Sequence, residues 1–209
     1  MARRSRGIEE RRAELLEAAR RLFVRDGFAE VSVSRIVRAV GVAQGTFYYY
    51  FDSKEEVLDA LVRAHVQEVA ARLAEVASDA TRDPRRTLQE MIRTELDFDS
   101  GRASELGAIR GADARTKLFS ATLRTLAPVY AGVLARGQVA KAFAAGPADL
   151  LAEIVVLTTH SLVDRDLLGW TGREYARRRK ALEGLVCTVI GVPQGTFDFG
   201  ATPPARRGR

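Results

Sequence analysis

Apolar residues recur at intervals of three and four along almost the whole of this 209-residue chain, and no segment sustains strict alternation of apolar and polar residues. Spacing of three and four places side chains on one face of an α-helix, whereas a half-buried strand requires alternation. The six prolines fall mostly at the boundaries between these stretches, where they disturb helices least. The sequence therefore predicts an all-α fold of nine helices.

Local signals set the bounds of these helices. Ser32 and Ser53 are suited to cap helix starts, while Gly27 and Gly41 are suited to end helices in a left-handed conformation. Pro128 falls inside the seventh helix and is expected to kink it. The predicted ranges are about 8–26, 33–40, 44–51, 54–77, 84–100, 103–110, 114–136, 147–168 and 172–190. These ranges predict three parts of the chain: an N-terminal domain over 1–53, a second helical domain over 54–191, and a C-terminal tail over 192–209.

The amino-acid composition argues against several classes of protein. The single cysteine, Cys187, and the two histidines, His65 and His160, lie far apart in the sequence, so neither a disulfide framework nor a Cys/His zinc module is expected. No cofactor is expected either. The most apolar run, residues 150–163, is interrupted by charge and is shorter than a membrane span. We expect a soluble cytoplasmic protein without membrane contact, and we expect it not to be an enzyme.

Net charge alone identifies no nucleic-acid-binding part. The chain carries 33 Lys and Arg against 27 Asp and Glu, a net charge of +6. Residues 1–56 hold 11 basic and 9 acidic residues, a difference of only +2. Charge must be located on a surface before it indicates a partner.

The segment from Gln44 to Phe51 is more informative. Phe47 and Phe51 lie four residues apart, on the helix side that packs against the preceding helices. Three adjacent tyrosines, at positions 48–50, cannot all be buried on so short a helix, and their hydroxyls and rings suit phosphates, base edges and thymine methyls. Two short helices joined at Gly41 after an amphipathic first helix are typical of a helix-turn-helix unit. An ordinary helical hairpin remains the alternative at this point.

The residues from Ser32 to Leu58 resemble the DNA-binding domain of the TetR family of bacterial transcriptional regulators. The matching positions are Ile36, Ala39, Gly41-Val42, Gly45-Thr46, Tyr48, Tyr50-Phe51 and Ser53-Lys54-Glu55, with Ala18, Ala19, Phe23 and Gly27-Phe28 in the first helix. The resemblance covers about the first 60 residues. Ala43 departs from it, because relatives commonly carry a Ser or Thr cap there.

The resemblance implies a set of DNA-binding residues. They are Ser32, Ser34, Arg35 and Arg38 on the second helix, Gln44, Gly45, Thr46, Tyr48, Tyr49 and Tyr50 on the recognition helix, and Lys54 as a phosphate contact. Tyr48 as a hinge residue, and Arg35 and Arg38 as solvated side chains, remain alternatives. Arg3, Arg4 and Arg6 are either a DNA-binding arm or a solvated end.

The resemblance also implies a small-molecule pocket in the second domain. Glu95 and Asp99 share a helix face with apolar residues, which is unusual unless carboxylates are paired or functional. They suggest a basic or polyhydroxylated ligand, or else ion pairs with Arg93, Arg102 or Arg110. The candidate ligand-binding residues are Ile92, Glu95, Leu96, Asp99, Phe119, Leu123, Tyr130 and His160.

The last two helices are expected to form a homodimer interface. The stretch 150–162 is apolar nearly all round, which requires burial on two sides. By resemblance to the family, the interface residues are Leu157, Leu162, Leu182, Leu185, Val186 and Val189. A two-fold dimer presents two recognition helices and therefore predicts a palindromic operator.

These observations favour a sequence-specific DNA-binding regulator, a repressor released from double-stranded operator DNA by a small-molecule effector. The alternative from another class is a helical small-molecule-binding protein or enzyme with an incidental basic N-terminal domain. A purely architectural DNA binder is a third alternative, disfavoured by the large helical domain.

Overall fold

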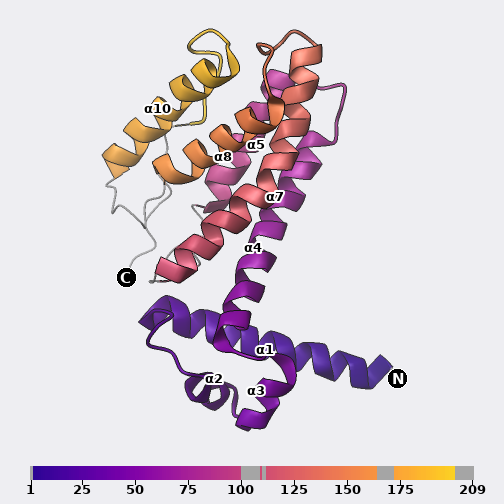
Figure 1. The fold of residues 1–209 in the computed structure, drawn as a ribbon, viewed down its shortest axis with the longest axis vertical. Coiled ribbons are helices and arrows are strands. Elements are labelled where there is room, and N and C mark those ends of the chain that lie inside the picture. The colour runs from indigo at the N-terminus through magenta and orange to yellow at the C-terminus, as the bar shows by residue number, and fades with distance from the viewer. Residues whose placement is uncertain (1, 100–108, 110–111, 164–171, 201–209) are drawn as a thin grey trace. The chain divides into compact units, whose positions relative to one another are not determined.

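A computed structural model describes residues 2–99, 109, 112–163 and 172–200. Within these residues all regular structure is α-helical, which confirms the predicted fold class (Figure 1). The helices are α1 (Ala2–Asp26), α2 (Val33–Val40), α3 (Gln44–Tyr50), α4 (Lys54–Ala77), α5 (Pro84–Asp99), α7 (Ala112–Val139), α8 (Ala148–Val163) and α10 (Gly172–Ile190). The helix expected near 103–110 lies almost wholly outside the described residues, as do residues 164–171 at the expected end of α8.

The chain forms two compact units. The first comprises Met1–His65 with Glu105–Phe119, and the second comprises Val66–Ser104 with Ser120–Arg209. Helices α4 and α7 each contribute residues to both units. Within the first unit, Lys117 at the start of α7 forms an ion pair with Asp59 of α4.

Helix α1 ends as predicted but begins earlier. Gly27 adopts a φ of 93°, and its N–H donates to the Phe23 carbonyl at 2.9 Å. The Phe28 ring closes onto Phe23 edge to face, with centroids 5.1 Å apart. The helix starts at Ala2, and Ile8 is exposed rather than part of the buried stripe. The buried face begins only at Leu15, so the preceding turns are supported by local charge pairs such as Arg11 with Glu14.

The caps of the next helices follow the sequence signals. The Ser32 hydroxyl accepts from the Arg35 N–H at 3.3 Å, and Gly41 ends α2 with a φ of 76°. Ala43 precedes α3 without a side-chain cap, as its methyl group dictates. The Ser53 hydroxyl accepts from the Glu56 N–H at 3.2 Å at the start of α4. These caps fix where α2 and α4 begin.

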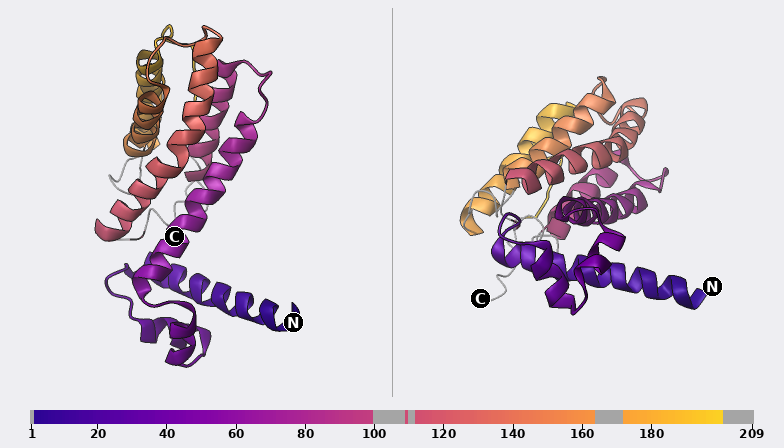
Figure 2. Two further views of the ribbon diagram at one scale, coloured as in Figure 1. Left: turned by 45° about the vertical axis from the view of Figure 1, so that its right-hand side comes forward. Right: turned by 60° about the horizontal axis from the view of Figure 1, so that its bottom comes forward.

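The second unit is a helical bundle. Helices α8 and α10 lie side by side, run in opposite directions and make the main contact between helices of this unit (Figures 1 and 2). Helix α7 is long and apolar enough, by length and composition alone, to cross a membrane between Asp113 and Val139. Core helices meet the same criterion, and Leu126, Tyr130 and Leu134 of α7 are buried. We therefore interpret α7 as a core helix.

The first part of the expected C-terminal tail, residues 192–200, follows α10 and packs on the second unit. Phe197 and Phe199 are buried and stacked, with centroids 5.7 Å apart. The Asp198 N–H donates to the Gln89 side chain of α5 at 2.9 Å, and the Phe199 N–H donates to Glu183 Oε1 of α10 at 3.0 Å. Residues 192–200 thus pack on the second unit, because two large apolar rings gain more from burial than from solvation.

Candidate nucleic-acid interface and effector site

Helix α3 divides into a buried and an exposed side. Phe47 is fully buried and contacts the ring of Phe51, with centroids 5.7 Å apart. Tyr48 and Tyr49 remain 51% and 70% exposed. Gln44 and Gly45 are also exposed, and Thr46 and Tyr50 are half-buried. The exposed side therefore offers an amide, two phenols and bare backbone, all of which suit base edges and phosphates.

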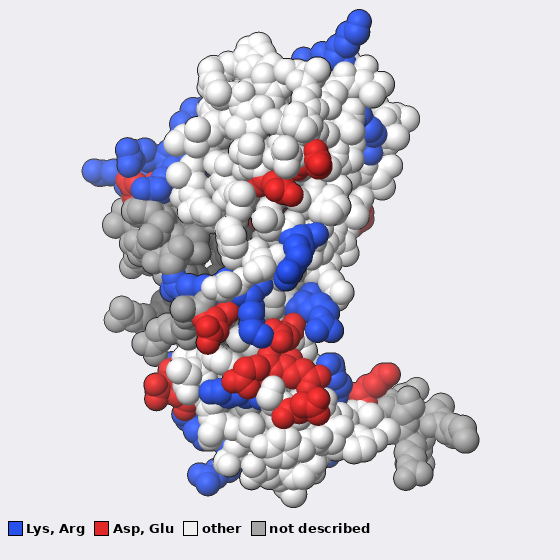
Figure 3. All heavy atoms as spheres, in the orientation of Figure 1, with Lys and Arg blue, Asp and Glu red and all other residues white. Residues whose placement is uncertain are grey.

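The second helix adds exposed residues beside α3, with which it packs. Ser34 and Arg38 are exposed, and Ser32 is exposed while its hydroxyl caps the helix. In Figure 3 the surface at the α3 end of the first unit is largely uncharged, and a group of acidic side chains with basic ones around it lies above that end. The candidate interface is therefore polar and aromatic rather than strongly basic, in agreement with the small charge excess of the first 56 residues.

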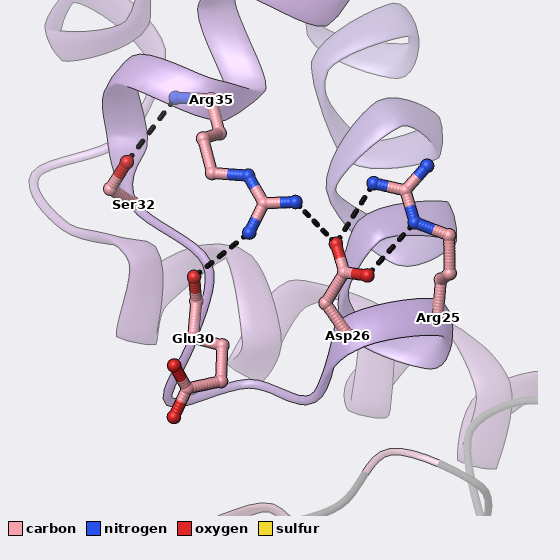
Figure 4. A network of polar contacts seen from close by, with 5 residues as sticks. All are labelled: Arg25, Asp26, Glu30, Ser32 and Arg35. Atoms are coloured by element: carbon pink, nitrogen blue, oxygen red, sulfur yellow. Dashed lines mark hydrogen bonds and ion pairs between the residues drawn. The ribbon is translucent and has the colours of Figure 1, made fainter.

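Arg35 is engaged within the protein (Figure 4). Its guanidinium donates to Asp26 Oδ2 at 2.5 Å and to the Glu30 carbonyl at 3.0 Å. Arg25 also donates to both carboxylate oxygens of Asp26, each at 2.9 Å. The hydrogen bond from Arg25, reinforced by that from Arg35, lowers the pKa of Asp26 to about 2. Arg35 is thus tied to the end of α1, although its side chain is still 39% exposed.

Lys54 is engaged in the same way. Its Nζ donates to the carbonyls of Phe28, Ala29 and Val31 at 3.1, 3.3 and 3.1 Å. It also lies 4.6 Å from the centroid of the Phe28 ring. An ammonium has three donors, and all three are used here. The expected phosphate contact by this side chain is therefore not supported, because its hydrogen-bonding capacity is filled by the protein.

The candidate effector residues divide into two groups. Ile92, Glu95, Leu96 and Tyr130 are all buried in the second unit. Tyr130 Oη donates to Glu95 Oε2 at 2.5 Å, which joins α5 to α7 through a buried carboxylate. The sequence suggested arginines as partners of Glu95, whereas in the structure the hydroxyl of Tyr130 is its partner. A carboxylate in such apolar surroundings needs polar partners.

The other expected effector residues do not join this buried group. Phe119 is exposed and belongs to the first compact unit. Leu123 and His160 are half-buried. The side chain of Asp99 lies outside the described residues.

The expected dimer residues require a correction. Leu182 and Val186 are buried inside their own chain, so they do not offer a surface to a second copy. Leu185 is 45% exposed, and Leu157, Leu162 and Val189 are half-buried. Sequence reasoning missed Leu150 and Ile154 of α8, which are 52% and 43% exposed. Their spacing of four predicted that they share one side of the helix, but it did not show whether that side is buried or exposed.

Sequence reasoning also missed two buried charged residues on α10, Arg179 and Glu183, which lie one turn apart. Arg179 forms an ion pair with Asp97 of α5 at 3.6 Å, and Glu183 forms one with Lys180 at 2.5 Å. Arg179 Nη2 donates to the Phe199 carbonyl, while Glu183 accepts from the Phe199 N–H. The only signal was two opposite charges four residues apart, which elsewhere is typical of a solvated helix face.

The fold and this surface define a helix-turn-helix protein with a second helical unit. Residues 15–61 match the family described as bacterial regulatory proteins, tetR family. Over these residues the chain is similar to the DNA-binding part of that family.

Comparisons with single proteins show the same similarity. The HTH-type transcriptional repressor KstR2 of Rhodococcus jostii is 33% identical over 88 residues, which is 42% of this chain and 43% of KstR2. The chain thus aligns with less than half the length of this relative. Two solved structures share the fold. Reduced NemR of E. coli has a TM-score of 0.65 at 20% identity, covering 88% of this chain and 100% of NemR. FadR of Bacillus subtilis, in complex with stearoyl-CoA, has a TM-score of 0.64 at 22% identity, covering 83% and 97%.

Proposed function

We propose that this protein is a sequence-specific DNA-binding transcriptional repressor of the bacterial cytoplasm, and not an enzyme. The observation that carries the proposal is the exposed side of α3, where Tyr48 and Tyr49 stand in solvent although large aromatic rings are normally buried. KstR2, which is similar over the matching region, is a transcriptional repressor. DNA contacts are assigned to Ser32, Ser34, Arg38, Gln44, Gly45, Thr46, Tyr48, Tyr49 and Tyr50.

The proposed active form is a homodimer on a palindromic operator. Leu150 and Ile154 of α8 and Leu185 of α10 are exposed apolar residues on two helices that pack against each other. Exposed apolar patches of this kind mark interaction sites. Two copies joined there present two α3 helices, as a palindromic site requires.

The proposed regulator is a small molecule held in the second unit. The buried Glu95 carboxylate, bonded to Tyr130 among apolar residues, supplies a polar anchor in an apolar setting, which is the usual make-up of a ligand site. FadR of Bacillus subtilis, which shares this fold, is in complex with stearoyl-CoA in its solved structure. Binding of an effector favours the state of the dimer with low operator affinity.

A titration against DNA from upstream of the protein's own gene tests the function. Fluorescence anisotropy at moderate salt is expected to show binding at least about 10³-fold tighter than to a shuffled duplex of equal length. Equal affinity for the two duplexes rejects the repressor and leaves a helical ligand-binding protein or enzyme as the better interpretation.

Two variants at one position test the α3 surface. Tyr48→Ala removes the ring and the hydroxyl. It is expected to weaken specific binding by about 1–3 kcal/mol, because the side chain is half exposed on the proposed DNA-binding side of α3. Tyr48→Phe removes the hydroxyl alone and separates a hydrogen bond from ring contact. Unchanged specific affinity in both variants removes Tyr48 from the interface.

A further inference from the structure

The connection between α1 and α2, residues 27–32, has an unusual set of hydrogen bonds. Four consecutive backbone carbonyls, those of residues 28–31, accept from cationic side chains of other elements. Carbonyls in an irregular segment need partners, and water normally supplies them at a surface. Here the protein supplies charged donors instead, so this connection is held from two sides.

Lys54 holds the connection from α4. It is the first residue of that helix, and its three donors reach the carbonyls of Phe28, Ala29 and Val31. The ammonium also lies over the face of the Phe28 ring, a cation–π geometry. Phe28 in turn contacts Phe23 of α1. Lys54 therefore joins the start of α4 to the end of α1.

Arg35 holds the same connection from α2. Its guanidinium takes the remaining carbonyl, that of Glu30, and the carboxylate of Asp26 at the end of α1. The Ser32 hydroxyl fixes the first turn of α2 just beside it (Figure 4). The position of α2 relative to α1 thus depends on two cations, both of which are bonded to groups of the protein itself.

We propose that Lys54 and Arg35 are positioning residues, which set α2 for DNA binding by clamping the connection between α1 and α2 and not by touching DNA. This inference rests on the proposed function as a DNA-binding protein. Lys54 is the first residue of α4, so the clamp fixes the connection to the start of that helix.

The salt dependence of operator binding separates positioning from phosphate contact. Each lost phosphate contact lowers the slope of log K against log [salt] by about 0.9. Lys54→Gln is expected to weaken binding about tenfold, in the range of lost charged hydrogen bonds, with the slope unchanged. Arg38→Gln, at an exposed arginine of α2, is the matched control and is expected to lower the slope.

Lys54→Arg sharpens this test. The variant keeps the positive charge, so a phosphate contact survives in it, whereas a planar guanidinium does not fit three carbonyls gathered around one point. We expect weaker binding with an unchanged slope. Full affinity of Lys54→Arg, or a reduced slope in Lys54→Gln, overturns the positioning role of Lys54.

Asp26→Asn tests Arg35 through its partner. This variant removes a negative charge and releases Arg35, so a phosphate-binding Arg35 predicts tighter operator binding. A positioning Arg35 predicts weaker binding, again about tenfold, because the clamp loses its anchor on α1. Affinity equal to or above that of the wild type overturns the positioning role of Arg35.

Hydrogen exchange measured without DNA tests the clamp independently of the proposed repressor function. In Lys54→Gln, the amides of Val31 and Arg35, both bonded within or beside the connection, are expected to exchange about tenfold faster. The Phe51 amide, bonded to the Phe47 carbonyl, is the internal control. Unchanged exchange at Val31 and Arg35 rejects the clamp, whereas absent operator binding of the wild type rejects only the repressor.

Discussion

Gly45 occupies the second position of α3, where a β-carbon would meet open space. A glycine in a helix costs about 0.5–1 kcal/mol of stability relative to alanine. Among the described residues no close packing at the β-position of Gly45 offsets this cost. Gly45→Ala is therefore expected to raise the free energy of unfolding by about 0.5–1 kcal/mol and to weaken operator binding, because a methyl group keeps DNA from the backbone. Urea unfolding and anisotropy measure the two effects.

Gly132 of α7 provides the control for that substitution. It is also an exposed helical glycine with open space around its β-position. Gly132→Ala is expected to stabilise the protein by a similar amount and to leave operator binding unchanged. Equal operator affinity of Gly45→Ala and the wild type contradicts a close approach of DNA at α3.

Asp26 gives the first unit a specific acid sensitivity. Its pKa is lowered from 3.8 to about 2, chiefly by the hydrogen bond from Arg25 and then by that from Arg35. A carboxyl with a depressed pKa in the folded state stabilises above its unfolded pKa and loses that contribution as the pH falls through the folded value. The stability difference between the wild type and Asp26→Asn is expected to shrink between pH 3.8 and about pH 2. Thermal unfolding followed by circular dichroism measures it, and a constant difference over this window contradicts the assignment.

At the scale of elements, the exposed apolar side of α8 and α10 determines the expected assembly. Leu185→Glu places a charge among Leu150 and Ile154 of the proposed interface, where an unpaired buried charge is strongly unfavourable. We expect the variant to be monomeric at concentrations where the wild type is dimeric. Light scattering coupled to size-exclusion chromatography measures the mass.

Val139 offers the matched control for this element. It is an apolar residue at the end of α7 and is 86% exposed. Val139→Glu is expected to leave the mass of the assembly unchanged. A dimeric Leu185→Glu variant excludes the α8 and α10 surface as the interface.

At the scale of the whole molecule, the segment 192–200 joins parts of the second unit that are distant in sequence. Asp198 contacts Gln89 of α5, 109 residues away, and Phe199 lies between Arg179 and Glu183 of α10. A chain ending at Val192 is expected to lose at least about 3 kcal/mol of unfolding free energy, since burial of Phe197 and Phe199 is lost. Urea unfolding compares this truncation with the full chain.

A chain ending at Gly200 is the control for the truncation. It keeps both phenylalanines and their contacts, so the difference between the two truncated chains isolates the contribution of residues 193–200. Phe199→Ala in the full chain is expected to cost about 3–5 kcal/mol. Equal midpoints for the two truncated chains contradict a structural role of this segment.

The helices were predictable because their signals act within one or two turns. The caps at Ser32 and Ser53 and the left-handed stops at Gly27 and Gly41 depend only on residues up to four positions away. The split of α3 into a buried Phe47 side and an exposed tyrosine side follows from helical spacing alone. The fold class and the α3 part of the candidate interface were therefore available from the sequence.

The sequence by itself determined the helices, the helix-turn-helix unit and the residues on the exposed side of α3, because each of these depends on local spacing. Only the tertiary structure decided the partners of the charged groups. Lys54 contacts carbonyls 23 to 26 residues away, and Tyr130 contacts Glu95, 35 residues away. Residues so distant in sequence become neighbours only after the helices pack, and an Arg or Lys looks the same in a sequence whether it contacts a phosphate or a carbonyl of its own chain.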